Sequence, residues 1–146
     1  QQLVAKQPKW KDLTEFHAKH KYIYMSHNQH KARQLGKMLA ENSKTDITGL
    51  CSAYLEKMMA LLKVRATRKN HVNTLRHIQG YLKNYLSASD KQELVETMEQ
   101  YRLGYLPLIV PITLLKHHFR HHPDQYILNS YYLKPHPSEL MLLNNL

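Results

Sequence analysis

The fold is decided by residues 46–62, DITGLCSAYLEKMMALL, in which apolar side chains recur every three or four positions. The recurring side chains are Ile47, Leu50, Cys51, Tyr54, Leu55, Met58, Leu61 and Leu62. This spacing is typical of one face of an α-helix, and such a face must be buried against other elements. The polar residues 43–46 precede it and supply Thr45 or Asp46 as a helix cap.

The same period extends along the rest of the chain. Residues 10–25, 28–42, 69–86 and 94–102 predict further helices. Gly104 then favours a left-handed cap, and Pro107 prevents continuation. The next helix is predicted to begin between Leu108 and Val110 and to run to about His121. A short helix over 124–133 and a last apolar turn at 138–144 are predicted after it. We therefore expect an all-α fold, a single compact domain of six to eight helices at 10–146, after a flexible segment at 1–9.

Composition narrows the class of protein further. The chain has 146 residues, a net charge of +10 and one cysteine. This length suits one domain, and a lone cysteine excludes an internal disulfide framework or a multi-cysteine metal site. Such cysteine usage favours a reducing, cytoplasmic location. The most apolar stretch, residues 103–115, is interrupted by two prolines and is shorter than the roughly 20 residues that span a membrane, so no membrane partner is expected.

The helix predicted at 69–86 has one apolar and one basic face. The outward face collects Lys69, Asn73, Arg76, His77, Gly80, Lys83 and Asn84, and no acid occurs between Lys57 and Ala88. A basic face of this kind is typical of nucleic-acid binding, although a solvated surface would look the same. Gly80 lies inside the predicted helix, where glycine costs about 1 kcal/mol relative to alanine. It therefore indicates close approach by another helix or by a ligand.

Eleven histidines raise the question of a metal. His117 and His121, like His118 and His122, are four apart on a predicted helix, but the HExxH pattern is absent and no acid lies near before Asp124. Surface or capping histidines are the favoured interpretation, with no metal and no cofactor. Cys51 lies on the apolar stripe, where a buried thiol is unreactive. No catalytic residue is predicted, because nucleophile and phosphate-loop motifs are also missing.

Three blocks carry a resemblance to a known family. They are residues 71–81 (HVNTLRHIQGY), 101–117 (YRLGYLPLIVPITLLKH) and 132–140 (YLKPHPSEL), with Phe16-His17 and His20-Lys21 as earlier matching positions. On these residues the chain resembles the YbgA family, a bacterial domain of unknown function. That family also occurs fused behind a TudS-type desulfidase domain, which removes sulfur from thiolated uracil by iron–sulfur chemistry. The resemblance implies that this chain is similar to the accessory, RNA-binding part, because it lacks the cysteines of the catalytic domain.

The charge pattern and the resemblance together predict a non-catalytic RNA-binding domain. Its expected ligand is tRNA, including tRNA that contains 4-thiouridine. The expected nucleic-acid contacts are Arg65, Arg68, Lys69, Asn73, Arg76, His77, Gly80, Tyr81, Lys83, Arg102, Lys116 and Arg120. The alternatives are a module that docks a separate desulfidase or DNA-repair enzyme, an enzyme with a histidine-bound metal, and a binder of DNA or of a small anion.

Overall fold

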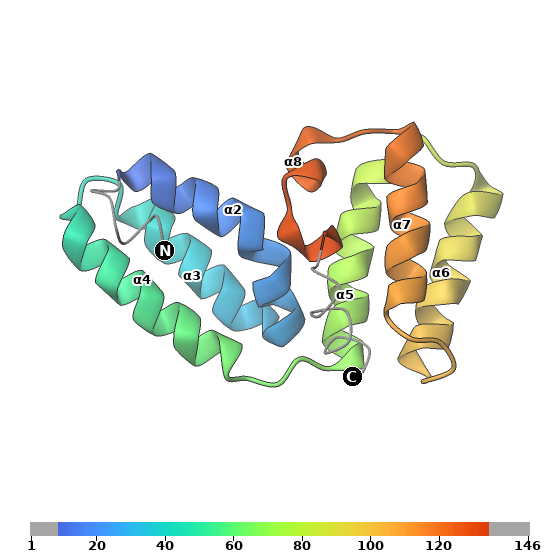
Figure 1. The fold of residues 1–146 in the computed structure, drawn as a ribbon, viewed down its shortest axis with the longest axis horizontal. Helices are drawn as coiled ribbons and strands as arrows, with labels where there is room; N and C mark the ends of the chain where they lie inside the picture. The colour runs from blue at the N-terminus through green and yellow to red at the C-terminus, as the bar shows by residue number, and fades with distance from the viewer. Residues whose placement is uncertain (1–8, 135–146) are drawn as a thin grey trace.

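The computed structural model describes residues 9–134. The stretch at 46–62 forms α4 (Ile47–Leu62), and Asp46 caps it by accepting a hydrogen bond from the Gly49 backbone N–H at 3.0 Å. Before it lie α2 (Trp10–His27) and α3 (Gln29–Glu41). Asn28 joins these two helices and caps α3 through a 2.9 Å hydrogen bond from the Lys31 N–H. The three helices pack on one another and form the group at the left of Figure 1.

A second group follows a short loop. It contains α5 (Arg68–Gln79), the 3-10 helix η1 (Gly80–Leu82), α6 (Ala88–Arg102) and α7 (Ile109–His121). The hydroxyls of Thr67 and Ser87 cap α5 and α6. Gly104 has a φ of +91°, the left-handed conformation predicted after α6, and Pro111 lies in the first turn of α7, where its missing N–H does least harm.

The segment after α7 corrects one predicted element. Residues 124–133 form two short pieces, α8 (Gln125–Leu128) and the 3-10 helix η2 (Tyr131–Leu133). Ser130 stands between them in an extended conformation, and its side chain accepts a hydrogen bond from the Tyr132 N–H. This local side-chain bond competes with helix continuation. As a result η2 turns back to pack on α2.

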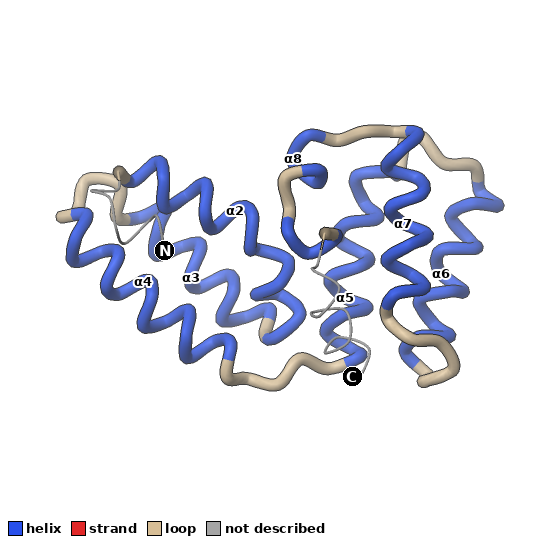
Figure 2. The backbone as a smooth tube through the Cα atoms, in the orientation of Figure 1, coloured by secondary structure: helices blue, strands red, loops and turns tan. Residues whose placement is uncertain are grey.

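The helix α5 is the member of the second group that faces the first, and it contacts α2, α6 and α7 (Figure 1). Its side chains Val72, Leu75 and Ile78 are at most 3% exposed. Within residues 9–134 there are seven α-helices and no strand (Figure 2), which confirms the all-α class and the single compact domain. No helix in that range is both long and apolar enough to cross a membrane. Residues 1–8 of the segment predicted at 1–9, and the predicted turn at 138–144, lie outside the described residues.

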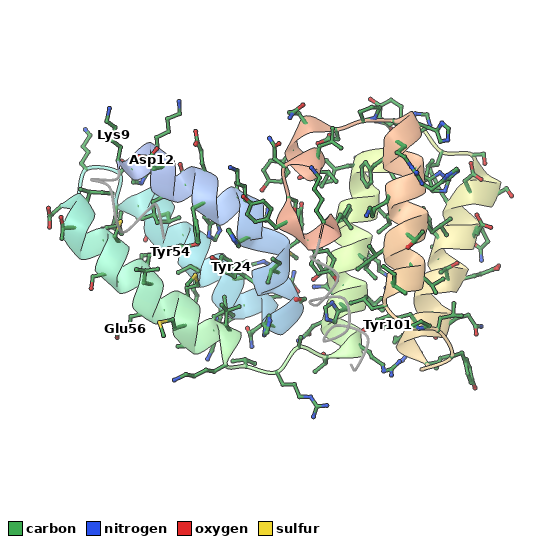
Figure 3. All side chains as sticks on the ribbon, in the orientation of Figure 1. Lys9, Asp12, Tyr24, Tyr54, Glu56 and Tyr101 are labelled. Atoms are coloured by element: carbon green, nitrogen blue, oxygen red, sulfur yellow. The ribbon has the colours of Figure 1, made fainter. Side chains whose placement is uncertain are left out.

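Several buried polar groups are paired across helices. Tyr54 on α4 donates a 2.9 Å hydrogen bond to the Tyr24 hydroxyl on α2, and the two rings lie together inside the first group (Figure 3). On α5, His71 is 0% exposed, and its Nδ1 lies 2.6 Å from the Tyr132 hydroxyl of η2. Burial, with a smaller contribution from nearby His27, lowers the pKa of His71 from 6.5 to about 4. His71 is therefore neutral in the folded protein at pH 7.

This lowered pKa predicts acid sensitivity. The unfolded chain takes up a proton on His71 near pH 6.5, whereas the folded chain resists protonation until about pH 4. Stability therefore falls as the pH drops from 6.5 towards 4, by about 3 kcal/mol from this residue in total. We expect His71→Gln to reduce that pH dependence in urea unfolding at pH 7 and pH 5, and the exposed-site control His117→Gln to retain it. Equal pH dependence in all three proteins would contradict the assignment.

Candidate nucleic-acid interface

The predicted basic face on α5 is only partly open to solvent. Lys69, Arg76 and His77 are exposed. Asn73, which lies between them, is half-buried and donates a 2.6 Å hydrogen bond to the Gln29 side chain at the start of α3. Asn73 therefore holds α5 to the first group. The part of the face that stays exposed is a narrow stripe formed by Lys69, Arg76 and His77, which we call the α5 stripe.

The stripe also has an acidic neighbour that the linear sequence does not reveal. Glu99 on α6 receives two hydrogen bonds from Arg102, at 2.9 and 2.5 Å. These bonds, with a smaller contribution from the positive charge of Arg76, lower the pKa of Glu99. No acid adjoins this face along the sequence, but Glu99 lies near it in the folded protein. The positive charge of the face is therefore partly offset beside Arg76. Arg102 is already paired with Glu99.

The remaining predicted contacts are dispersed. Arg68 donates a 3.1 Å hydrogen bond to the Tyr101 carbonyl oxygen and packs its guanidinium 5.5 Å from that ring's centroid, so it ties α5 to the end of α6. Arg65 is exposed in the loop before α5, and Lys83 is exposed in the turn after η1. Lys116 and Arg120 line a separate groove of about 270 Å³ against α8. The structure does not bring these residues into one surface.

Gly80 is not in a helix interior. The helix α5 ends at Gln79, and Gly80 begins η1 with a φ of −54°, a conformation that any residue adopts. A Cβ built at Gly80 would meet no described atom within 4 Å. The interior-glycine interpretation is therefore wrong, and no helix packs closely there that would require glycine.

A better cluster of positive charge lies in a groove of about 400 Å³ where α2, α3, the end of α5 and α8 meet. We call it the basic groove. It is lined by His17, Ala18, Lys21, Met25, Gln29, Ala32, Arg33, Gly36, Lys37, His77 and Tyr126. Of the residues predicted from sequence, the groove contains only His77, whose Nε2 lies 3.5 Å from the Gln29 side-chain nitrogen.

The charges of the basic groove are not neutralised within it. In the part of the chain that the structure describes, no aspartate or glutamate lines it. Lys37 Nζ lies 4.0 Å from Oε2 of Glu41, which does not line the groove, and both side chains are more than half exposed. Such exposed pairs contribute only about 0.3–0.5 kcal/mol, so Lys37 remains free to bind an anion together with Lys21 and Arg33.

The wall of the basic groove is fixed by a close approach of α2 and α3. A Cβ at Gly36 would lie 3.2 Å from His17 Nε2, so glycine lets the α3 backbone approach that ring. On its other side, His17 Nδ1 lies 3.1 Å from the Tyr54 hydroxyl. Burial, then the positive charges of Lys21 and His20, lower the pKa of His17 to about 4. His17 is therefore a neutral polar group beside the cations.

Aromatic faces lie next to the basic groove. Tyr126 stacks on Tyr81 with ring centroids 6.0 Å apart, and Tyr22 donates a 3.2 Å hydrogen bond to the Tyr81 hydroxyl. Tyr81 and Tyr126 are 36% and 37% exposed, whereas Tyr22 is buried. Exposed aromatic rings beside cations are the usual means by which proteins stack unpaired bases. Tyr81, predicted as a contact, therefore belongs to this surface.

The histidines on α7 are corrected in one respect. His117 and His121 are exposed with ring centroids 4.9 Å apart, as surface residues, but His118 is 7% exposed because its face of α7 packs on α6. No acid lies near this segment along the chain before Asp124, but α6 brings Asp90 and Glu93 beside His118 in the fold. Cys51 is half-buried, and burial raises the pKa of its thiol, which is consistent with low reactivity.

The fold and the basic groove define a small all-α domain with a cationic junction between two helical groups. Residues 21–137 match the family described as protein of unknown function (DUF1722), and the chain belongs to that family. It is also 27% identical over 131 residues to the uncharacterized protein YbgA of Escherichia coli (strain K12), covering 89% of this chain and 78% of the relative. This similarity confirms the resemblance to YbgA. No solved structure matches the chain.

The open surroundings of Gly80 give a direct test of its role. Gly80→Ala is expected to stabilise the protein by about 0.4–1 kcal/mol, because alanine fits the observed conformation and restricts the unfolded chain. Thermal unfolding measures the change in stability. RNA affinity tests the alternative, that a ligand approaches the Gly80 backbone closely. Destabilisation, or a loss of affinity in a folded variant, would show that something approaches the Gly80 backbone after all.

Proposed function

We propose that this protein is a cytoplasmic RNA-binding domain that takes the phosphate backbone into the basic groove. The observation that carries the proposal is the convergence of Lys21, Arg33 and Lys37 on a groove with no lining acid among residues 9–134. A net charge of +10 adds a long-range attraction for polyanions.

The neighbouring tyrosines favour RNA with unpaired bases over a uniform duplex. Tyr81 and Tyr126 expose ring area beside the cations, and base stacking on an aromatic ring contributes about 1–3 kcal/mol per base. Arg33 and Tyr126 line the same groove, so a phosphate bound there would place an adjacent unpaired base on the side of an aromatic ring. The resemblance to an RNA-binding accessory domain favours tRNA, whose loops offer such bases.

Neutralising the basic groove tests the proposal. We expect Lys21→Ala/Arg33→Ala to weaken binding of unmodified, fluorescently labelled tRNA by roughly tenfold or more in 0.1 M salt. The slope of log K against log[salt] should fall by about 1.4–1.8, because two phosphate contacts are lost. The matched control is Lys11→Ala/Lys44→Ala, which removes two exposed lysines outside the groove lining, one in the first turn of α2 and one between α3 and α4, and should leave the slope unchanged.

A second pair of substitutions separates the basic groove from the α5 stripe. Arg76→Ala/Lys83→Ala removes the same charge from the face predicted by sequence and should weaken binding less than the groove variant does. The reverse order of effects would assign the interface to α5. Equal small effects in all three double variants, or no binding by the wild type, would contradict RNA binding through the groove.

A further inference from the structure

A second cluster of ligating side chains lies away from the basic groove. The helices α6 and α7 run antiparallel, so the start of α6 lies beside the end of α7 at the top of Figure 1. Asp90 and Glu93 are three residues apart on α6. One carboxylate oxygen from each, and a ring nitrogen of His118 on α7, all lie within 4.8 Å of one another.

The histidine of this cluster has an unmet bonding requirement. His118 is 7% exposed, and its Nε2 is buried without a hydrogen-bond partner among residues 9–134. Leaving a buried polar atom unpaired costs about 1–3 kcal/mol. A metal cation would remove that cost, because it accepts the imidazole lone pair and is attracted to the two carboxylates.

The two carboxylates are available to such an occupant. In the described part of the chain, no hydrogen bond or ion pair engages either side chain, and the nearest helix cap uses the Asp90 backbone N–H rather than its carboxylate. Asp90 is half-buried and Glu93 exposed. An ion can therefore enter from solvent on the carboxylate side and meet the buried imidazole.

The ligand set points to a class of ion. Imidazole with carboxylates suits Zn²⁺ and similar first-row divalent ions better than Mg²⁺ or Ca²⁺, which prefer oxygen alone. Ligand atoms 2.0–2.2 Å from a tetrahedral ion lie roughly 3.4 Å apart. In the structure the three ligand atoms lie up to 4.8 Å apart. A small movement brings them to the shorter distances, and the exposed Glu93 side chain permits it. Three protein ligands leave a position open for water.

We propose that Asp90, Glu93 and His118 bind one Zn²⁺ ion between α6 and α7. The ion joins the start of one helix to the end of the next and therefore stabilises the second helical group. Bound metal raises the free energy of unfolding in proportion to the logarithm of its concentration over Kd. The site is independent of RNA binding in the basic groove.

The test is Zn²⁺ titration of chelator-treated, tag-free protein by calorimetry, with the thermal midpoint as a second readout. We expect one Zn²⁺ per chain and a rise in the midpoint. Glu93→Gln should weaken binding at least tenfold, because loss of a ligand should cost no less than loss of a group that supports a ligand, which costs about 10–100-fold, and His118→Gln should abolish it. Because Glu93 is exposed, its variant keeps the test valid even if the buried histidine variant is unstable.

Two controls distinguish this site from adventitious binding. Glu96→Gln changes an exposed glutamate one turn further along α6 and should leave the affinity for Zn²⁺ unchanged. His117→Gln/His121→Gln removes the exposed histidine pair and should also have no effect. The proposal is overturned if no Zn²⁺ binds, if Glu93→Gln binds as tightly as the wild type, or if the binding is lost with the exposed pair instead.

Discussion

The packing of α5 on the first helical group as well as on α6 and α7 of its own group is the constraint on which the rest of the structure depends. One side of this helix contacts α2, and the other sides contact α6 and α7. Its polar side chains also bridge the groups: Asn70 donates to the His27 carbonyl oxygen at 3.2 Å, and Asn73 donates to Gln29 at 2.6 Å. Because these bonds fix how the first group meets α5, they also determine the shape of the basic groove.

This central position explains why the helix pattern predicted the fold better than the site. Periodicity assigned Val72, Leu75 and Ile78 to the core, and all three are buried. The same pattern placed Asn73 on the outward face, and the charge pattern made Arg68 a nucleic-acid contact. For Asn73 and Arg68 that inference fails, because a helix surrounded by others uses polar side chains to bond its neighbours. One helix's sequence does not reveal which of its polar residues meet another helix.

Local chemistry made other features predictable. Helix ends followed from Asp46 as a cap and from Gly104 as a left-handed residue, since each acts within a few positions of itself. The basic groove has no such local signal, because Lys21, Arg33 and Tyr126 come from three different helices. The same is true of Asp90 and His118, which only the packing of α6 on α7 brings together.

The claim that the junction of the two helical groups receives RNA can be tested most directly by mapping the contact surface. Amide chemical shifts of isotope-labelled protein, followed during titration with a short single-stranded RNA, report which backbone sites respond. The account predicts that the responses concentrate around Lys21, Arg33, His77 and Tyr126. Responses confined to Lys69, Arg76 and the adjoining part of α6, with the groove unchanged, would contradict it.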